Sequence, residues 1–195
     1  LVVALAAVAA ACRPAESGPP GANTTDPQWV HRHDPRADVA VVFVHGIFGD
    51  TVGTWTADGR PSMFDLLHDH PAVGPKVDMF AFGYTSNMFA AGSLSIQEAA
   101  NSLHGRLQLE RILDYPAIVF VAHSMGGLVV LRELLTHRED LLPRVRGLVF
   151  YATPQEGSQI TRIAGHVANN PAIAEMLPGD QNLSLQQLDN EWKAL

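Results

Sequence analysis

The sequence has a single cysteine and few basic residues, and both shortages narrow what the protein can be. One cysteine among 195 residues cannot form an internal disulfide or supply a cysteine-rich zinc cluster, so the hydrophobic core must hold the fold together. Lysine and arginine total 13 against 20 acidic residues, which gives a formal net charge of -7. Because a net acidic chain without a Lys/Arg run has no electrostatic footprint for phosphates, nucleic-acid binding is not expected.

The sequence also lacks an apolar run long enough to cross a membrane. The longest run, Leu1 to Cys12, is shorter than the roughly 18 to 20 residues that a membrane-spanning helix needs. Its length and small-residue ending are typical of the hydrophobic region of a signal peptide, although no charged leader precedes it. Cys12 directly follows three alanines, which resembles a bacterial lipoprotein signal, whose cysteine becomes lipidated. Simple secretory cleavage and an uncleaved apolar segment are the alternatives. We therefore expect a secreted or cell-envelope protein, with membrane anchoring through Cys12 if that residue is lipidated.

Residues 13–36 are expected to form a flexible tether, because most of this stretch is rich in Pro, Gly, Ser and Thr and shows no apolar periodicity. From residue 37 onward, apolar runs alternate with helical patterns, which is typical of βαβ units on a parallel sheet. The nearly continuous apolar character of the expected strands indicates that both faces of the sheet are covered. These strands are Val39–Val44, Val77–Phe82, Ala117–Ala122 and Gly147–Ala152.

Two helices are predicted between these strands. Ser95, with Glu98 three residues later, predicts a capping box that begins a helix between the second and third strands. A second amphipathic helix is expected between the third and fourth strands, where the apolar positions are Leu128, Leu131, Leu134 and Leu135.

The strongest chemical signal is a serine between an apolar strand and a helix, in the run Ala122-His123-Ser124-Met125-Gly126-Gly127. A nucleophilic serine on a sharp strand-to-helix turn is held in a strained backbone conformation, so small residues must stand two before and two after it. Ala122 and Gly126 meet this requirement. The amide of Met125 would then point into the site at the positive end of a helix. The alternative is that Ser124 merely caps the helix. His123 is expected to be a scaffold residue of the turn.

A second signal directly follows the first expected strand, in the run His45-Gly46-Ile47-Phe48-Gly49-Asp50. Acyl transfer needs two backbone N–H donors aimed at the developing oxyanion, and a glycine-rich turn at a strand end can present one of them. We predict that the amide of Ile47 is this donor, opposite the amide of Met125, and that His45 and Gly46 support the loop. The alternative is an ordinary turn that ends a strand.

These runs resemble the α/β-hydrolase superfamily, and within it the lipase-like serine hydrolases, which include the serine-active-site-containing proteins and the inositol deacylases. Thr54-Trp55 and the run Tyr151-Ala-Thr-Pro-Gln-Glu-Gly-Ser158 add to the resemblance, which covers roughly residues 37 to 158. Two positions depart from the pattern. Ala122 replaces the first glycine of the usual elbow, and Gln155 stands where this branch often carries His. The resemblance implies an α/β-hydrolase fold over residues 37–195, with a mostly parallel sheet and helices on both faces.

In this superfamily the catalytic residues follow the order Ser, then Asp or Glu, then His, with the last two on loops after later strands. No apolar run after Ala152 predicts another strand, so we expect the chain to be a fragment at both ends, with the acid and the histidine beyond residue 195. Glu156 is a weaker candidate for the acid, and His137 and His166 are weaker candidates for the base. The pairs His31/His33 and His68/His70 have a spacing seen in metal sites, but without an evident third ligand they are interpreted as solvated loop histidines.

The resemblance implies a serine hydrolase of carboxylic esters that acts on a lipid or another acyl ester and needs no metal or organic cofactor. Ser124 would attack the ester and form an acyl-enzyme. An acyltransferase or a thioesterase can use the same elbow. A non-catalytic envelope lipoprotein that retains the fold as a binding module is the alternative from another class. The oligomeric state does not follow from the sequence.

The position of Cys12 after the apolar run generates the first prediction. The parent protein, expressed in a bacterial host, should be recovered in the membrane fraction, and Cys12→Ala should move it to the soluble fraction because the site of lipid attachment is lost. Immunoblotting of fractionated cells measures this. Equal soluble recovery of the two forms would instead favour simple secretion.

Overall fold

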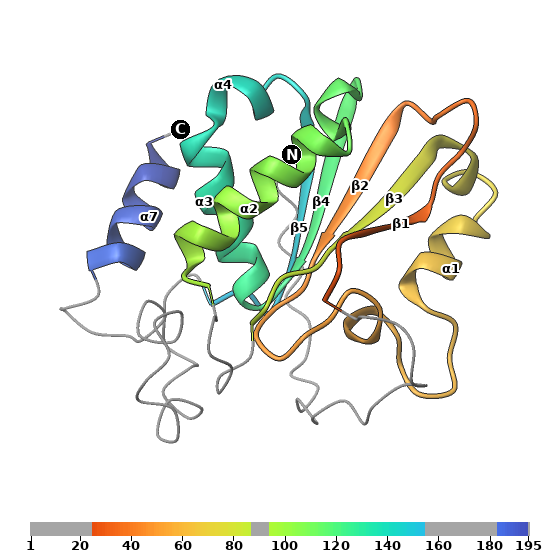
Figure 1. Cartoon of the computed structure of the whole chain (residues 1–195), viewed down its shortest axis with the longest axis horizontal. Coiled ribbons are helices and arrows are strands. Elements are labelled where there is room, and N and C mark those ends of the chain that lie inside the picture. Colours follow the sequence, from red (N-terminus) through yellow and green to blue (C-terminus); the bar gives the residue numbers. More distant parts are fainter. Residues whose placement is uncertain (1–24, 87–93, 155–182, 195) are drawn as a thin grey trace.

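The computed structural model describes residues 25–86, 94–154 and 183–194, in which a mostly parallel, five-stranded sheet is the central element (Figure 1). The strand order is β1-β3-β2-β4-β5. β1 pairs antiparallel with β3, whereas the other neighbouring strands are parallel. The strands are β1 (Gln28–His31), β2 (Val39–Val44), β3 (Val77–Phe82), β4 (Ala117–His123) and β5 (Val145–Tyr151). The predicted signal segment, including Cys12, lies outside the described residues.

The four strands expected from apolar runs are confirmed. β2 and β3 have the predicted bounds, β4 extends one residue further, and β5 is shifted toward the N-terminus, beginning at Val145 and ending at Tyr151. All six residues of β3 and five of the six in β2 are buried, as expected for strands covered on both faces. The fold class predicted from the resemblance, a mostly parallel α/β sheet with helices on both faces, is also confirmed.

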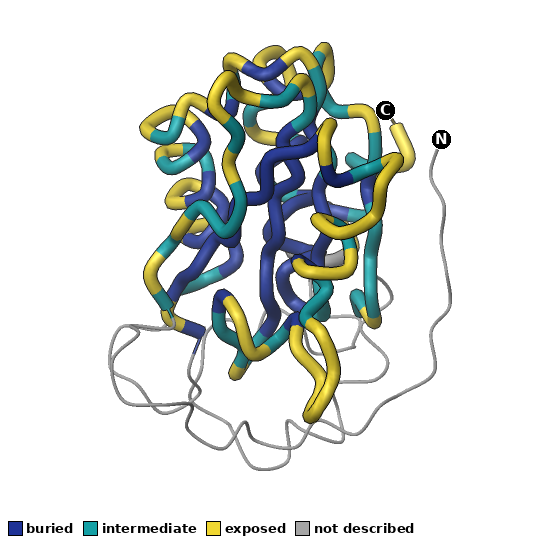
Figure 2. Tube along the Cα trace, turned by 90° about the vertical axis from the view of Figure 1, so that its right-hand side faces the viewer, coloured by how far each residue is buried: buried dark blue, intermediate teal, exposed yellow. Residues whose placement is uncertain are grey.

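Helices cover the two faces of the sheet with separate cores. Alternate strand residues such as Val42, Phe82 and Phe120 pack in one core with the apolar residues of α2 (Ile96–Leu109) and α3 (Met125–Thr136). The residues that point the other way, such as Phe43 and Met79, pack in a second core with α1 (Met63–His68) and the short helix Gly53–Trp55. Figure 1 shows α2 and α3 on one side of the sheet and α1 on the other. In Figure 2 the buried residues lie in the middle of the molecule, surrounded by exposed segments.

Local sequence signals account for the helix ends. Ser95 accepts a hydrogen bond from the Glu98 amide and the Glu98 side chain accepts one from the Ser95 amide, so the predicted capping box is confirmed.

α4 (Arg138–Leu141) follows α3, and α7 (Leu183–Lys193) packs against α3 through buried Leu188. Single turns of 3-10 helix also occur at Gly74–Lys76 and Ile112–Asp114. Within the described ranges, no helix is both long and apolar enough to cross a membrane.

The structure differs from the expected tether at its C-terminal end, where residues 28–31 form β1 along the edge of the sheet. The physical reason is tertiary contact. The Trp29 ring lies 5.3 Å from the Phe80 ring and 6.0 Å from the Tyr115 ring, and its indole N–H donates to a Glu110 carboxylate oxygen at 2.8 Å. The Arg32 guanidinium lies over the same indole, 4.6 Å from the ring centroid. Four residues are too few to show a strand periodicity, so the partners of Trp29 decide the structure here.

Asp78, on β3, joins β1 and the segment after it to the sheet. Its fully buried carboxylate accepts hydrogen bonds from the amide and Nδ1 of His33, from the amide of Ala37 and from the hydroxyl of Tyr115, at 2.7 to 3.1 Å. Burial by itself raises the pKa of the Asp78 carboxyl, but the hydrogen bonds from Tyr115, His33 and Ala37 outweigh it and hold the pKa below its usual value. The ionised carboxylate therefore stabilises the folded state.

Asp78→Asn should lower the free energy of unfolding by about 2 to 3 kcal/mol at pH 7, because an amide nitrogen would face donors that a carboxylate oxygen now accepts from. Because folding depresses this pKa, the stabilisation is present above the ordinary carboxyl pKa of about 3.9 and is lost as the pH falls through the lower folded value. The difference in the free energy of unfolding between the parent and Asp78→Asn should therefore become smaller in acid. Urea denaturation at a series of pH values measures this difference. Tyr115→Phe, which removes one of the four bonds and leaves the charge in place, should lower the free energy of unfolding by about 1.5 kcal/mol.

Candidate active site

The two predicted catalytic loops meet at the point where the chain reverses its direction of travel across the sheet. β2 lies between β3 and β4, so the chain adds β3 on one side of β2 and then returns to add β4 on the other. In open α/β sheets, ligands bind at the carboxyl ends of the strands at such a point. Val44 pairs with Ala122 in the parallel register, so the residues that follow β2 and β4 leave the sheet side by side.

Ser124 has the strained backbone that the elbow requires. Its φ is 53° and its ψ is -124°, an unfavourable conformation for a residue with a side chain. Its amide donates to the Tyr151 carbonyl at 2.8 Å, which ties the turn to the end of β5. The Ser124 side chain makes no capping hydrogen bond to α3, so the alternative that this serine is a helix cap is not supported. Its hydroxyl is not committed to the helix.

Backbone closely approaches backbone on both sides of this turn. A Cβ on Gly126 would overlap the Val44 carbonyl oxygen and lie 2.5 Å from that of His45, so the first turn of α3 rests directly on the end of β2. A Cβ on Gly46 would lie 2.6 Å from the Ser124 Cβ. Glycine is therefore required at both positions, which fixes the His45–Gly46 turn against the serine.

The predicted oxyanion donors stand next to this contact. Ile47 follows Gly46, and Met125 follows Ser124 as the first residue of α3, where helix amides have no partner within the helix. The side chains of both residues pack into the core on the α3 side of the sheet. The structure thus brings the two predicted donors onto adjacent stretches of backbone at the positive end of a helix.

His45 is a buried scaffold of the loop. Its Nε2 accepts a hydrogen bond from the Tyr84 amide at 3.3 Å, so Nδ1 carries the proton and donates to the Gly46 carbonyl at 2.9 Å. The Tyr84 hydroxyl donates to the His45 carbonyl at 2.8 Å, and the two rings stack 4.5 Å apart. Burial lowers the pKa of His45 below its ordinary value, and a protonated ring could not accept from Tyr84. His45 is therefore neutral and fixed in one tautomer.

The rest of the loop closes on itself. The Gly49 amide donates to the Gly46 carbonyl at 3.1 Å, and the Asp50 carboxylate accepts from two amides of the following turn, on Val52 and Gly53. Phe48 has a positive φ of 60° and its side chain is 44% exposed. The loop therefore has a defined shape and presents one aromatic side chain to solvent.

Of the weaker candidates for the triad, only His137 lies within the described residues, and it does not reach this site. About 18 Å of helix separates Ser124 from Thr136, and His137 follows that end of α3, so His137 is too far away to be the base. Glu156, His166 and Gln155 lie outside the described residues. His123 is the last residue of β4, where burial lowers the pKa of its imidazole, and its role as a scaffold residue stays a prediction.

The two histidine pairs whose spacing is seen in metal sites, His31/His33 and His68/His70, lie in contact with each other. The His31 and His68 rings stack 4.1 Å apart, and Nδ1 of His33 is engaged by Asp78 at 2.7 Å. Burial, followed by the charge of His68, lowers the pKa of His31. His70 accepts a hydrogen bond from the Ala72 amide at 3.3 Å. These contacts fit side chains that hold β1 and α1 together.

The sequence reasoning missed three residues around the site. Tyr84 and Ser86 follow β3 and support the loop, Ser86 by donating to the Gly46 carbonyl at 3.1 Å and by accepting from the Phe48 amide through its own carbonyl. Thr153 follows β5 and packs so tightly against Gly127 that a Cβ there would overlap its side chain. Their place directly after strands at the same edge of the sheet was the signal that could have identified them.

Comparison with known proteins bears on the family and the fold of this chain. Residues 41–194 match the family model described as the alpha/beta hydrolase family. The chain is 24% identical over 174 residues to Protein SERAC1 of Homo sapiens, covering 75% of this chain and 26% of that protein, and 26% identical over 162 residues to Protein SERAC1 of Danio rerio, covering 68% and 24%. The chain spans about a quarter of the length of these relatives.

Solved structures show the same fold. The mature lipase BlEst2 of Bacillus licheniformis superposes with a TM-score of 0.59 at 16% identity, covering 87% of this chain and 66% of that one. Phospholipase PlaB of Legionella pneumophila superposes with a TM-score of 0.56 at 16% identity, covering 79% and 35%. At these identities the likeness concerns the fold alone.

The close approach at Gly126 generates a stability prediction. Gly126→Ala should lower the free energy of unfolding by about 1 to 3 kcal/mol, because the added methyl must displace the end of β2. Gly105→Ala is the matched control, since Gly105 is exposed in the interior of α2 and has open space around it. That change should raise stability by about 0.5 to 1 kcal/mol. Equal urea midpoints for the two variants would show that α3 does not rest on β2 in this way.

Proposed function

Because the chain belongs to the alpha/beta hydrolase family, we propose that it hydrolyses carboxylic esters, with Ser124 as the nucleophile and a lipid or another acyl ester as the substrate. One observation carries this proposal: Ser124 occupies a strained turn between β4 and α3 and makes no capping bond to the helix. A strained serine costs about 1 to 3 kcal/mol of folding free energy. A module that only binds ligands has no need for that cost.

In the proposed reaction, the Ser124 hydroxyl oxygen attacks the ester carbonyl carbon while a general base takes its proton. The carbonyl oxygen becomes an oxyanion, which accepts hydrogen bonds from the amides of Ile47 and Met125. The intermediate then expels the alcohol, which takes the proton back from the base, and leaves an acyl-enzyme. Water then attacks that ester while the same base takes its proton. The carboxylic acid leaves, and the base returns the proton to the Ser124 oxygen. No metal or organic cofactor takes part in these reaction steps.

The buried scaffold supplies the preorganisation that this scheme requires. Neutral His45, Tyr84 and Ser86 anchor the carbonyls and amides around Gly46, so the Ile47 amide does not have to reorganise as the oxyanion forms. We infer that the histidine base and the acid of the triad lie outside the described residues, because His137 lies at the far end of α3.

The preference for a lipid-like acyl group rests on two supports. Phe48 presents an exposed aromatic ring on the oxyanion loop, where it can contact an apolar chain. The structural neighbours include a lipase and a phospholipase of the same fold. Lipidation at Cys12 would hold such an enzyme at a membrane of the cell envelope. An acyltransferase or a thioesterase would use the same oxyanion site, and differs in the acceptor or the leaving group.

Ser124→Ala in the complete protein should lower the rate of ester hydrolysis by about 10⁴-fold or more, the scale expected for loss of a nucleophile. Hydrolysis of nitrophenyl esters of increasing chain length measures this, and a fluorophosphonate should label the parent but not the variant. Ser102→Ala, at an exposed position of α2, is the matched control and should retain both turnover and labelling.

The same experiment separates the alternatives. Turnover of the Ser124 variant within tenfold of the parent would refute the nucleophile. Labelling with slow ester hydrolysis but rapid transfer to an added alcohol would indicate an acyltransferase, and preference for thioesters would indicate a thioesterase. A parent protein that is neither labelled nor active would support the non-catalytic binding module.

A further inference from the structure

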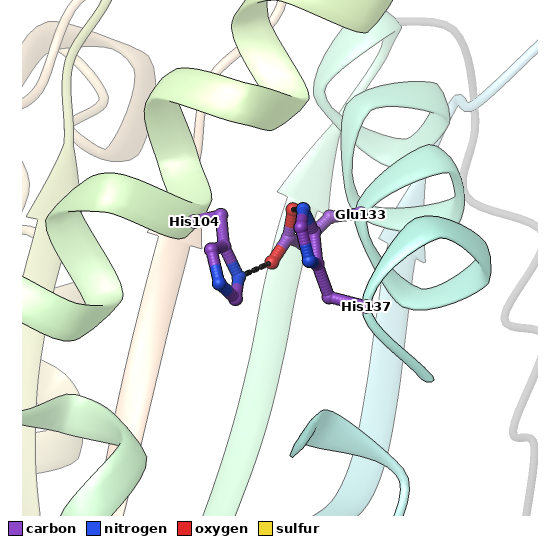
Figure 3. Close-up of side chains that lie close together, drawn as sticks. All are labelled: His104, Glu133 and His137. Carbon is purple, nitrogen blue, oxygen red and sulfur yellow. Dashed lines mark hydrogen bonds and ion pairs between the residues drawn. The ribbon is translucent and has the colours of Figure 1, made fainter. Parts of the chain in front are cut away.

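A cluster of three metal-ligating side chains lies between α2 and α3, away from the catalytic loops (Figure 3). His104 comes from α2, Glu133 from the last turns of α3, and His137 from the residue that directly follows α3. One ligand atom from each lies within 4.8 Å of the other two. Glu133 is nine residues from Ser124, about 14 Å along the helix, so this cluster is separate from the proposed catalysis.

Glu133 is the central residue of the cluster and is fully buried. His104 Nδ1 lies 2.7 Å from Glu133 Oε1, and His137 Nε2 lies 3.9 Å from Glu133 Oε2. Among the described residues, Oε2 has no hydrogen-bond partner. A buried carboxylate oxygen without a partner is costly, and such an atom in a folded protein commonly marks the place of a water or an ion.

The two imidazole rings restrict what can satisfy this carboxylate. They stack face to face with their centroids 3.5 Å apart and their planes 12° apart. Two protonated rings at this distance would repel each other, so the pair cannot supply two positive charges to Glu133. His104 Nδ1 shares a proton with Glu133 Oε1 in their 2.7 Å hydrogen bond, whereas a neutral ring whose proton is on the other nitrogen can give its lone pair to a metal ion. Figure 3 shows both rings beside the Glu133 carboxylate.

We propose that His104, Glu133 and His137 bind a divalent transition-metal ion of the Zn²⁺ type, which fastens α2 to the C-terminal end of α3. Two imidazoles and one carboxylate form a donor set that suits Zn²⁺, whereas Ca²⁺ and Mg²⁺ prefer oxygen ligands. Glu133 and His137 are four residues apart, which places both on one side of α3. Tetrahedral ligands about 2.0 to 2.1 Å from one ion lie about 3.4 Å apart, so the three ligand atoms, which now lie within 4.8 Å of one another, must draw together on binding. Imidazole lone pairs lie in the ring planes, so binding also turns at least one ring out of the stack.

Gln108 supplies the outer contact that metal-bound histidines generally have. Its amide nitrogen lies 3.0 Å from His104 Nε2, one helical turn along α2. Rotation of this amide group turns its oxygen toward Nε2, which can then donate its proton while Nδ1 binds the metal. Water can occupy the fourth position. The role of this ion is to brace the helix that carries the elbow, and it contacts neither Ser124 nor the oxyanion loop.

The test is titration of the chelator-treated, complete protein with Zn²⁺ by isothermal calorimetry. We expect one equivalent to bind, and an excess of about 100-fold over the dissociation constant to raise Tm by roughly 5 to 10 °C. Co²⁺ should bind with a visible ligand-field absorption, whereas Ca²⁺ and Mg²⁺ should give neither heat nor a Tm shift. Glu133→Gln and His137→Asn should each abolish the binding and the shift.

The controls keep each outcome decisive. His68→Asn removes a histidine from the other cluster, near α1, and should bind Zn²⁺ like the parent. If Glu133→Gln does not fold, His137→Asn decides alone, because the His137 side chain is 28% exposed and can be replaced without a cavity. Equal titrations of the parent and His137→Asn would overturn the proposal. So would a parent without a Zn²⁺-dependent Tm shift, in which case the cluster is a buried His–Glu pair that only packs the two helices.

Discussion

The close contact between the end of β2 and the first turn of α3 is the constraint on which the rest of the site depends. Because no side chain separates Gly126 from the Val44 and His45 carbonyls, the amino end of α3 is seated directly on the sheet. Ser124 must then turn from strand to helix within one residue, which forces its positive φ. The bond from its amide to Tyr151 and the parallel register of β2 with β4 hold that strain in place. The geometry of the candidate site is thus a consequence of how closely two backbones pack.

Much of the fold could be predicted from the sequence, because the features that set it are local. Strands covered on both faces are nearly continuous apolar runs. The capping box that marks the beginning of α2 is a motif of only four residues, from Ser95 to Glu98. β1 could not be found in this way. Its four residues follow a Pro- and Gly-rich stretch, and what makes them a strand is the packing of Trp29 on Phe80 and Tyr115. Those partners are 51 and 86 residues further along the chain, so the residues of β1 by themselves predict a tether where the structure has a strand.

The same distinction divides the residues of the site. Ser124 and its small neighbours follow from what one turn demands of its own backbone, so a short motif is enough to find them. Tyr84 and Ser86 act on a loop about 40 residues earlier, and their role appears only once β3 lies beside β2. His104 and Glu133 are 29 residues apart and lie on two different helices, and the sequence pattern of neither helix indicates that the two side chains meet. A sequence motif can therefore identify a candidate nucleophile such as Ser124. Residues that support the surrounding loops, such as Tyr84 and Ser86, are identified only once the topology of the sheet is known.

α3 carries residues of both kinds, those that a sequence motif identifies and those that only the topology brings together. Its amino end carries the elbow, its apolar face fills the core against β4 and α2, and its carboxyl end carries the Glu133 cluster. The rigidity of α3 links its two ends, because its backbone hydrogen bonds and close packing leave it little freedom to bend. A contact that holds its C-terminal end against α2 therefore also fixes the direction in which its amino end meets β2. If the amides of Ile47 and Met125 bind an oxyanion as proposed, they need that fixed direction, since amides that must reorient as charge develops lose much of their advantage over water.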